Sequence, residues 1–509
     1  MAINRLFLLI TVLLFFHIAQ SQSPEILKIR EYRIKEEQQI LNDLLNLLSV
    51  PNTATDTIGL RENANLLSQM MMQGGISNVQ LLQADAPSPP VVYGEVITPG
   101  ATRTIVFYAH YDGQPVDPAQ WAKGLSPFVP KIFTGRIDQG ATEVPRSQTP
   151  IDPNWRIYAR GSSDDKAGVM AIYNAYQAIK NSRIKLTCNI KFFFEGEEEH
   201  GSEHLVSILD KYKQLLQSDL WIICDGPIHQ TGKKQIVFGV RGDAGIDITV
   251  YGSSRPLHSG HYGNWAPNPA MRLAKLLASM KDDNGKVTIK GFYDDMKPIT
   301  EVEKKAIATL PPVDDQMKKE LGIREPEMKG KNLYESIMLP SLNIRGMQSA
   351  NIGDRASNVI PVSATASIDM RLVPGNESFR QQQKVIDHVQ RQEYYVTEKD
   401  PTSEERLKYD KIAKVVRRPS YDAMRTPMDN NFAKVVINAV RSATKEEVLL
   451  VPTMGGSLPL VHLEKKLNAR IIILPIANHD NNQHAENENL RLQNFWDGIE
   501  LLSSVMIMP

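Results

Sequence analysis

Short apolar strands that alternate with amphipathic helices limit how this chain can fold. The runs Thr104–Ala109 (TIVFYA) and Leu186–Phe194 (LTCNIKFFF) are rich in β-branched and aromatic residues, which is typical of strands covered on both faces. A helical pattern, Ala167–Ile179, lies between them, and further strand patterns follow at Leu220–Cys224 and Arg470–Leu474. Strands of this kind separated by helices predict an α/β fold with a mostly parallel sheet flanked by helices.

The pattern changes in the middle of the chain, which predicts an inserted domain. Asp243–Tyr251 and Ala364–Leu372 alternate polar and apolar residues, as expected for an antiparallel sheet with one exposed face. The parallel-sheet pattern then returns. Because 509 residues suffice for about two to four domains, we expect a main domain made of residues 22–238 and 415–509. An inserted α+β domain, residues 239–414, separates its two parts.

The N-terminus has the form of a secretory signal peptide, residues 1–21. Arg5 precedes the apolar run Leu6–Phe16, and small residues lead up to a predicted cleavage point near Ser21. The competing interpretation, a membrane anchor, needs an apolar run of about 20 residues, and this run is shorter. We therefore expect an exported protein, periplasmic or secreted, without a stable membrane anchor.

Composition excludes two classes of protein. Lys plus Arg and Asp plus Glu both number 58, so the chain is not a generally basic nucleic-acid binder, and we expect no nucleic-acid partner. Two cysteines, Cys188 and Cys224, are too few for a disulfide scaffold. Whether these two form a disulfide is left open by the sequence.

Histidine and acidic residues gather at the predicted strand ends. They are His110, Asp112, Asp164, Asp165, Glu198, Glu199, Asp225 and His484. Taken singly, each has an ordinary interpretation; Asp165, for example, fits the N-cap of the helix that follows it. However, ligands bind at the carboxyl ends of the strands in an open parallel sheet, so these side chains are expected to meet. Imidazole and carboxylate groups from five segments predict a metal site.

The same residues lie within longer motifs. These are HYDGQP (110–115), ARGSSDDKAG (159–168), FEGEEEHGS (194–202), CDGP (224–227), LHSGHYG (257–263) and NNQHAENE (481–488). In this order they resemble the two-zinc metallopeptidases of peptidase family M-20, which include carnosinases, carboxypeptidase G, acetylornithine deacetylase, succinyl-diaminopimelate desuccinylase and aminoacylase. GVRG (239–242) and IDMRLVPG (368–375) look most like the carnosinase-type dipeptidase branch. The resemblance implies a two-part catalytic domain and an inserted lid and dimerisation domain.

The resemblance also implies two Zn²⁺ ions per subunit. His110, Asp164 and Asp225 would hold one ion. Asp164, Glu199 and His484 would hold the other, so that Asp164 bridges the pair. Zinc binds imidazole and carboxylate ligands, although Mn²⁺ and Co²⁺ accept the same ligands.

Three further residues are assigned catalytic roles by the resemblance. Glu198 would act as general base, taking a proton from a water activated by the metal and passing it to the leaving amine. Asp112 would accept the second ring N–H of His110 and so fix its tautomer. His258, in the inserted domain, would reach the active site of the partner subunit in a homodimer and stabilise the oxyanion; its alternative is an ordinary surface or core histidine.

A last group is implied to bind the substrate carboxylate. Arg371 suits bidentate binding of a carboxylate, although it could equally form a structural ion pair. Asn358 is expected to assist in the same way. Gly455, Gly456 and Ser457 would offer backbone N–H groups and a hydroxyl, with a plain loop as the alternative.

These assignments predict a hydrolase that cleaves an amide bond next to a free carboxylate in dipeptides or short peptides. An N-acyl-amino-acid deacylase is the second prediction, because it needs the same machinery. A non-catalytic peptide-binding or scaffold protein is the alternative of another class, and the presence of Glu198 argues against it. Residues 123–154 form a predicted surface excursion, longer than expected for the family, whose role as a lid is left open.

Overall fold

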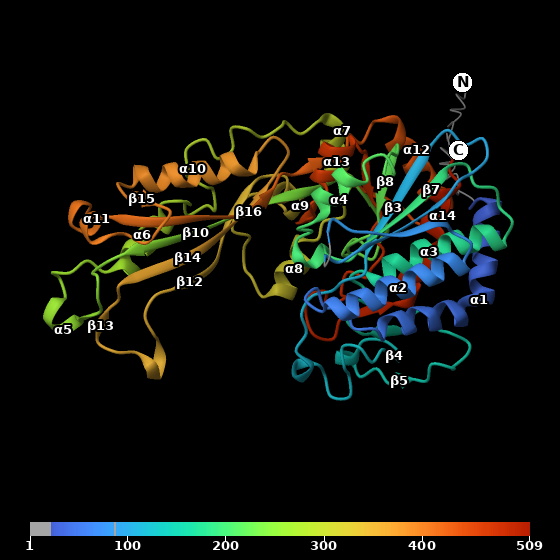
Figure 1. The fold of residues 1–509 in the computed structure, drawn as a ribbon, viewed down its shortest axis with the longest axis horizontal. Coiled ribbons are helices and arrows are strands. Elements are labelled where there is room, and N and C mark those ends of the chain that lie inside the picture. Colours follow the sequence, from blue (N-terminus) through green and yellow to red (C-terminus); the bar gives the residue numbers. More distant parts are fainter. Residues whose placement is uncertain (1–21, 86–87) are drawn as a thin grey trace, which may run out of the picture.

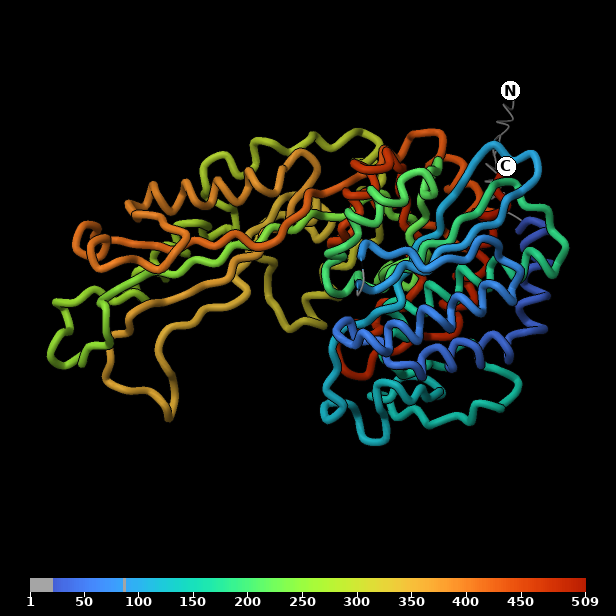
Figure 2. Tube along the Cα trace, viewed as in Figure 1, coloured from blue at the N-terminus to red at the C-terminus, as the bar shows by residue number. Residues whose placement is uncertain are grey.

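A computed structural model describes residues 22–85 and 88–509. The predicted signal peptide, residues 1–21, lies outside this described part. Figure 1 shows a rounded main lobe beside an elongated inserted lobe. Figure 2 shows that the main lobe combines the blue N-terminal and red C-terminal parts of the chain, whereas the middle of the chain forms the inserted lobe.

An eight-stranded sheet forms the centre of the main lobe. Its order is β1 (Ser77–Leu82), β2 (Val91–Val96), β7 (Asn189–Glu195), β3 (Thr104–His110), β8 (Leu220–Ile223), β20 (Ile471–Ile473), β9 (Gln235–Val237) and β18 (Leu449–Val451). The central strands β7, β3, β8 and β20 are parallel, whereas β1 and β2 pair in antiparallel fashion with their neighbours. Strand β9 is antiparallel to β20 and parallel to β18. The predicted α/β fold is confirmed.

Helices cover both faces of this sheet. On one face lie α1 (Pro24–Leu48), α2 (Thr57–Gln73), α3 (Lys166–Asn181), α12 (Asn431–Ala443) and α14 (Leu492–Met506); on the other lie α4 (Leu205–Lys211) and α13 (Val461–Leu467). Phe107 and Phe192 face the first layer, whereas Tyr108 and Phe193 face the second. Apolar residues at consecutive positions therefore fill two separate cores, which explains the nearly continuous apolar runs.

The inserted lobe is built on a second sheet. Its order is β12 (Ser341–Gln348), β14 (Ser363–Leu372), β10 (Gly239–Tyr251), β16 (Ile412–Tyr421) and β15 (Tyr395–Thr397), with α6 (Pro269–Ala278) and α10 (Ser378–Arg391) packed against it. The start of β10 also pairs with β17 (Met424–Arg425) and β19 (Met454–Ser457). The predicted border between residues 414 and 415 falls inside β16, because this strand continues to Tyr421 and stays paired with β10.

The shorter elements of the inserted lobe lie in its connections. They are β11 (Leu257–His258), α5 (Ser259–Tyr262), α7 (Glu301–Thr309), α8 (Asp314–Leu321), α9 (Leu333–Ile337), β13 (Val359–Ile360) and α11 (Ser403–Lys408).

The predicted excursion, residues 123–154, is ordered against the main lobe. It contributes two strands of a four-stranded sheet, β21 (Asn489–Arg491), β6 (Arg156–Tyr158), β4 (Lys131–Phe133) and β5 (Glu143–Val144). Ile132 and Val144 are buried in the main core, and Arg136 Nη1 lies 3.1 Å from Asp480 Oδ2. The excursion thus packs against the loop that leads to His484.

Two further sequence questions concern the cysteines and the surface. Cys188 and Cys224 are both buried and unpaired, so they form no disulfide.

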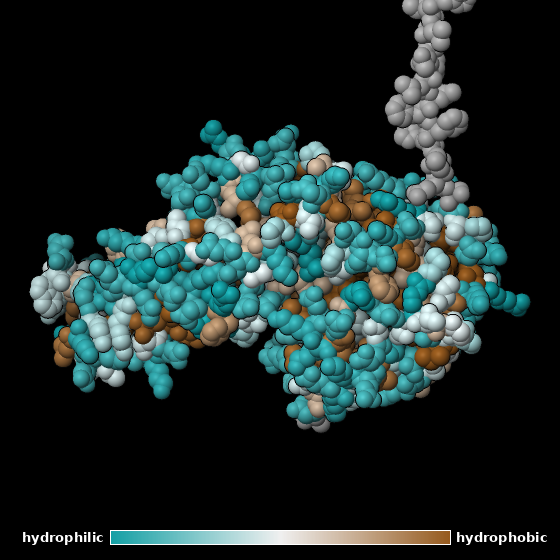
Figure 3. All heavy atoms as spheres, turned by 90° about the horizontal axis from the view of Figure 1, so that it is seen from above, coloured by the Kyte–Doolittle hydropathy of each residue, from teal (hydrophilic) through white to brown (hydrophobic). Residues whose placement is uncertain are grey.

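In the described part of the chain, no helix combines the length and apolar character needed to cross a membrane. Hydrophilic side chains cover most of both lobes in the view of Figure 3.

Candidate metal centre and active site

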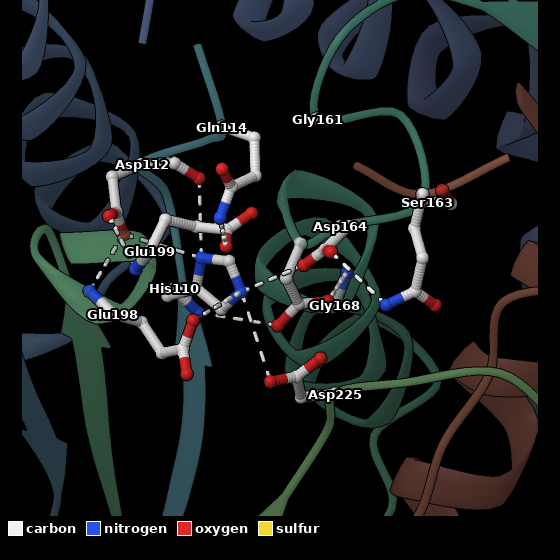
Figure 4. Close-up of polar contacts among 12 residues, drawn as sticks. His110, Asp112, Gln114, Gly161, Ser163, Asp164, Gly168, Glu198, Glu199 and Asp225 are labelled. Carbon is white, nitrogen blue, oxygen red and sulfur yellow. Dashed lines mark hydrogen bonds and ion pairs between the residues drawn. The ribbon is translucent and has the colours of Figure 1, made fainter. Parts of the chain in front are cut away.

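The central strands of the main sheet deliver the predicted ligands to one edge. His110 is the last residue of β3, and Asp225 follows closely after β8. Glu198 and Glu199 lie in a short 3-10 turn after β7, while Asp164 lies directly before α3. Because β3, β7 and β8 are parallel, their carboxyl ends converge, and Figure 4 shows the side chains meeting there.

The first ligand group consists of His110, Asp164 and Asp225. Their ligand atoms all lie within 4.8 Å of one another, and all three residues are buried. His110 Nε2 is 3.0 Å from Asp164 Oδ1 and 3.8 Å from Asp225 Oδ2.

The second ligand group consists of Asp164, Glu199 and His484, again with ligand atoms within 4.8 Å. His484 Nε2 is 3.0 Å from Asp164 Oδ2 and 3.5 Å from Glu199 Oε2. Asp164 therefore presents Oδ1 to one group and Oδ2 to the other. This is the geometry that a bridging carboxylate needs between two ions about 3.5–4 Å apart.

The electrostatics of the two groups fit divalent cations. Burial raises the pKa of Glu199 to about 8 and that of Asp225 to about 6. Burial opposes the ionisation of Asp164 as well, but its hydrogen bonds with His110 and His484 hold its pKa below the usual range. Several carboxylates thus share one site, in which the imidazoles of His110 and His484 face Asp164 and have raised pKa values because of these carboxylates. Imidazole and carboxylate donors are ligands that Zn²⁺ accepts.

Asp112 joins the first ligand group to the turn that carries the glutamates. Its Oδ1 lies 3.3 Å from His110 Nδ1, and its carboxylate accepts hydrogen bonds from the backbone N–H groups of Glu198 (3.2 Å) and Glu199 (2.9 Å). One fully buried side chain therefore orients both the imidazole and the turn.

Glu198 and Glu199 are neighbours in sequence, but their side chains contact different residues. Glu199 Oε2 accepts a 2.7 Å hydrogen bond from Gln114 Nε2 beside His484. Glu198 Oε2 lies 3.9 Å from His110 Nε2. Glu198 also lines a cavity of about 540 Å³. Burial raises the pKa of Glu198 well above its ordinary value. Glu198 therefore belongs to neither ligand group and lines the cavity beside them.

Comparison with known proteins identifies the family of this site. Residues 106–507 match the model described as "Peptidase family M20/M25/M40". The chain belongs to this family. It is 26% identical over 494 residues to the Cys-Gly metallodipeptidase dug1 of Schizosaccharomyces pombe, covering 93% of this chain and 96% of that one. It is 25% identical over 457 residues to the Beta-Ala-His dipeptidase of Mus musculus, covering 88% and 83%.

A solved structure shows the same fold. The M20 family metallo-carboxypeptidase Sso-CP2 from Sulfolobus solfataricus superposes with a TM-score of 0.75 and 26% identity, covering 92% of this chain and 98% of that one. The resemblance carried by the sequence motifs is confirmed, and with it the prediction of a metallopeptidase.

In this M20 peptidase, Glu488 is a site residue that sequence reasoning missed. Its carboxylate is fully buried and accepts hydrogen bonds from the N–H groups of Gly161 (2.9 Å), Ser163 (2.8 Å) and Asp164 (3.0 Å). Arg160 Nη1 donates to it at 2.7 Å. Glu488 therefore holds the turn that presents Asp164 to both ligand groups. Glu488 lies four positions after His484 in the motif NNQHAENE (481–488). Its place in that motif is the sequence feature that could have pointed to it.

Asp165 has the ordinary role that its position suggested. It is the N-cap of α3, and its Oδ1 accepts a hydrogen bond from the N–H of Gly168 at 3.2 Å. Its Oδ2 also accepts from the N–H of His110 at 3.3 Å, so the cap supports the end of β3.

Four of the predicted substrate-binding residues line the cavity beside Glu198. They are Arg371, Gly455, Gly456 and Ser457. The alternative for Arg371 also holds, because its Nε lies 3.3 Å from Asp369 Oδ2. That ion pair leaves the side chain about one-third exposed.

His258 and Asn358 do not line this cavity within their own chain. They lie together at the end of the inserted lobe, where β11 pairs with β13. The N–H of Ser259 donates to the backbone oxygen of Asn358, and His258 is exposed. A single copy of the chain therefore does not bring these two residues to the ligand groups.

Proposed function

We propose that this chain is a zinc-dependent dipeptidase that cleaves an amide bond next to a free carboxylate. One observation carries the proposal: two ligand groups share Asp164 beside Glu198, in a cavity that also contains Arg371. The names of the relatives, Cys-Gly metallodipeptidase and Beta-Ala-His dipeptidase, support a dipeptide substrate.

The chemistry follows from the residues that line the cavity. Two Zn²⁺ ions at the ligand groups would polarise the amide carbonyl and lower the pKa of a water molecule to roughly 7. Glu198 takes a proton from the attacking water and passes it to the leaving amine nitrogen. Arg371 binds the terminal carboxylate through parallel N–H donors, helped by the backbone at Gly455 and Gly456. Asp112 keeps the ring of His110 oriented throughout.

The same residues would also serve an N-acyl-amino-acid deacylase, because the carboxylate end of that substrate is identical. A non-catalytic peptide-binding protein is disfavoured, since binding alone does not need a carboxylate such as Glu198 beside the two ligand groups.

The test is release of free amino groups from a panel of dipeptides and N-acyl amino acids. Each would be measured with Zn²⁺, with Mn²⁺ and after chelation. Chelator-sensitive cleavage of dipeptides is expected. Cleavage of acyl amino acids alone would move the protein to the deacylase class, and no turnover with the metals fully bound would favour a binding protein.

We also propose a homodimer in which His258 of one subunit completes the site of the other. The exposure of His258 and its distance from the ligand groups along the inserted lobe support this arrangement. His258→Ala should lower kcat about 10²–10³-fold, because an oxyanion donor is lost, while the metal content stays unchanged. The matched control is His261→Ala, an exposed histidine whose ring lies 4.6 Å from that of His258.

Mixed dimers test whether His258 acts between subunits. His258→Ala and Glu198→Gln subunits, each nearly inactive alone, form one intact site when combined, since the Glu198→Gln subunit lends its His258 to its partner. Recovery of activity on mixing is expected. A kcat unaffected by His258→Ala, or mixed dimers as inactive as their parents, would contradict the proposal.

Export through the predicted signal peptide, residues 1–21, is part of the same proposal. Cell fractionation with N-terminal sequencing of the mature protein tests it, with a new N-terminus near Gln22 as the expected result.

A further inference from the structure

One wall of the cavity that holds Glu198 is apolar and is built by both lobes. Helix α9 contributes Leu333, Tyr334 and Ile337, and the main lobe adds Ile228 and Met454. Apolar surface of this kind favours apolar parts of a ligand.

Part of this wall adjoins the residues that would bind the carboxylate. A Cβ atom placed on Gly455 would lie 3.5 Å from Ile337 Cδ1, and one on Gly456 would lie 4.0 Å from Met454 Cε. A Cβ on Gly226, the residue after the ligand Asp225, would lie 3.1 Å from the same Met454 carbon. Ile337 and Met454 therefore flank the space between the ligand groups and the Gly455–Gly456 backbone.

The position of α9 is fixed by contacts to both lobes. Tyr334 Oη bonds to His229 Nε2 in the main lobe, and the N–H of Leu333 donates to Asp314 Oδ1 at 2.9 Å. Arg241 Nη2 donates to the backbone oxygen of Leu339, just after the helix, at 2.8 Å. Burial lowers the pKa of His229 to about 4, so this contact adds no charge to the wall at neutral pH.

Each charged group of the cavity already has a role in the proposed function. Among the described residues that line it, the charged side chains besides histidines are Asp164, Glu198, Asp225 and Arg371. The first three serve the metals and the proton transfer, and Arg371 would bind the substrate carboxylate. A charged side chain on the same substrate residue would therefore be buried without a partner, which is costly.

We propose that Ile337 and Met454 form the pocket for the side chain of the substrate's C-terminal residue, and that this residue is apolar, such as leucine, methionine or phenylalanine. This inference rests on the proposed function, because it takes Arg371 and the Gly455–Gly456 backbone as the carboxylate site.

The test compares kcat/KM for Ala-Leu, Ala-Lys and Ala-Asp with the full-length, Zn²⁺-loaded protein. The wild type should prefer Ala-Leu at least about tenfold over both charged dipeptides. Ile337→Asp should raise the Ala-Lys to Ala-Leu ratio about tenfold or more, and Ile337→Lys should do the same for Ala-Asp. Ile323→Asp is the matched control: Ile323 is 46% exposed, lies outside the cavity, and its substitution should leave both ratios unchanged.

The outcomes separate this inference from the proposed function. Equal rates for the three dipeptides, or ratios that neither Ile337 variant changes, would overturn the pocket while leaving the dipeptidase intact. If only N-acyl amino acids are cleaved, the dipeptidase proposal fails. The ratio of kcat/KM for N-acetyl-leucine to that for N-acetyl-lysine then shows whether the pocket prefers apolar side chains. If nothing is cleaved, calorimetric binding of the same three dipeptides decides it.

Discussion

Glu198→Gln is expected to reduce kcat about 10²–10⁴-fold without loss of bound metal. The amide keeps the shape of the side chain but cannot take a proton from water, which removes general acid–base catalysis. Metal content should stay at the wild-type level, because Glu198 belongs to neither ligand group. Steady-state kinetics on a cleaved dipeptide, combined with elemental analysis of the purified variant, measures both quantities.

The matched control for this variant is Glu203→Gln, which changes an exposed glutamate five positions further along the chain. Its kcat should equal that of the wild type. A Glu198→Gln protein that is fully loaded with metal and still turns over at the wild-type rate would show that another group moves the proton.

Glu488→Gln is expected to lower the free energy of unfolding by about 3–5 kcal/mol, since it leaves Arg160 as a buried charge without its partner. It should also weaken metal binding about 10–100-fold, as outer-shell substitutions do. The physical reason is that the N–H groups of Gly161, Ser163 and Asp164 all converge on this carboxylate. Urea unfolding of the metal-free protein and a Zn²⁺ titration provide the two measurements.

Glu486→Gln serves as the control, because Glu486 lies in the same loop but is exposed. It should change neither quantity. If Glu488→Gln unfolds like the wild type and binds Zn²⁺ equally well, the carboxylate does not hold the Asp164 turn.

The meeting of the ligand residues at one edge of the sheet could be predicted because the rule that governs it is local. A residue directly after a buried parallel strand lies at the ligand-binding edge, whatever the rest of the fold; His110 and Asp225 are examples. Asp112 lies two residues beyond His110, and its role beside the imidazole was implied by the family resemblance. His484 was included because its loop follows the strand pattern at Arg470–Leu474, but only the family resemblance assigned it to the second ligand group.

Other parts of the site escaped sequence reasoning for physical reasons. Glu488 lies in a polar run, where a glutamate is usually solvated, and only the tertiary fold buries it. Helix α9 is too short for its periodicity to be detected, so the apolar wall around Ile337 went unnoticed. Strands β4 and β5 span two or three residues each, which is below what alternation can reveal. The predicted border fell inside β16 because its sequence, IAKVVRRPSY, has no regular alternation that would mark where the strand ends.

The order in which the chain supplies its ligands bears on when activity begins. The first ligand group is complete once residue 225 has been made, but His484 and Glu488 come from the loop just before the final helix α14. A ribosome-bound chain therefore lacks both the second ligand group and the carboxylate that holds the Asp164 turn. The chain therefore completes its proposed metal site only when its last segment has been synthesised and folded.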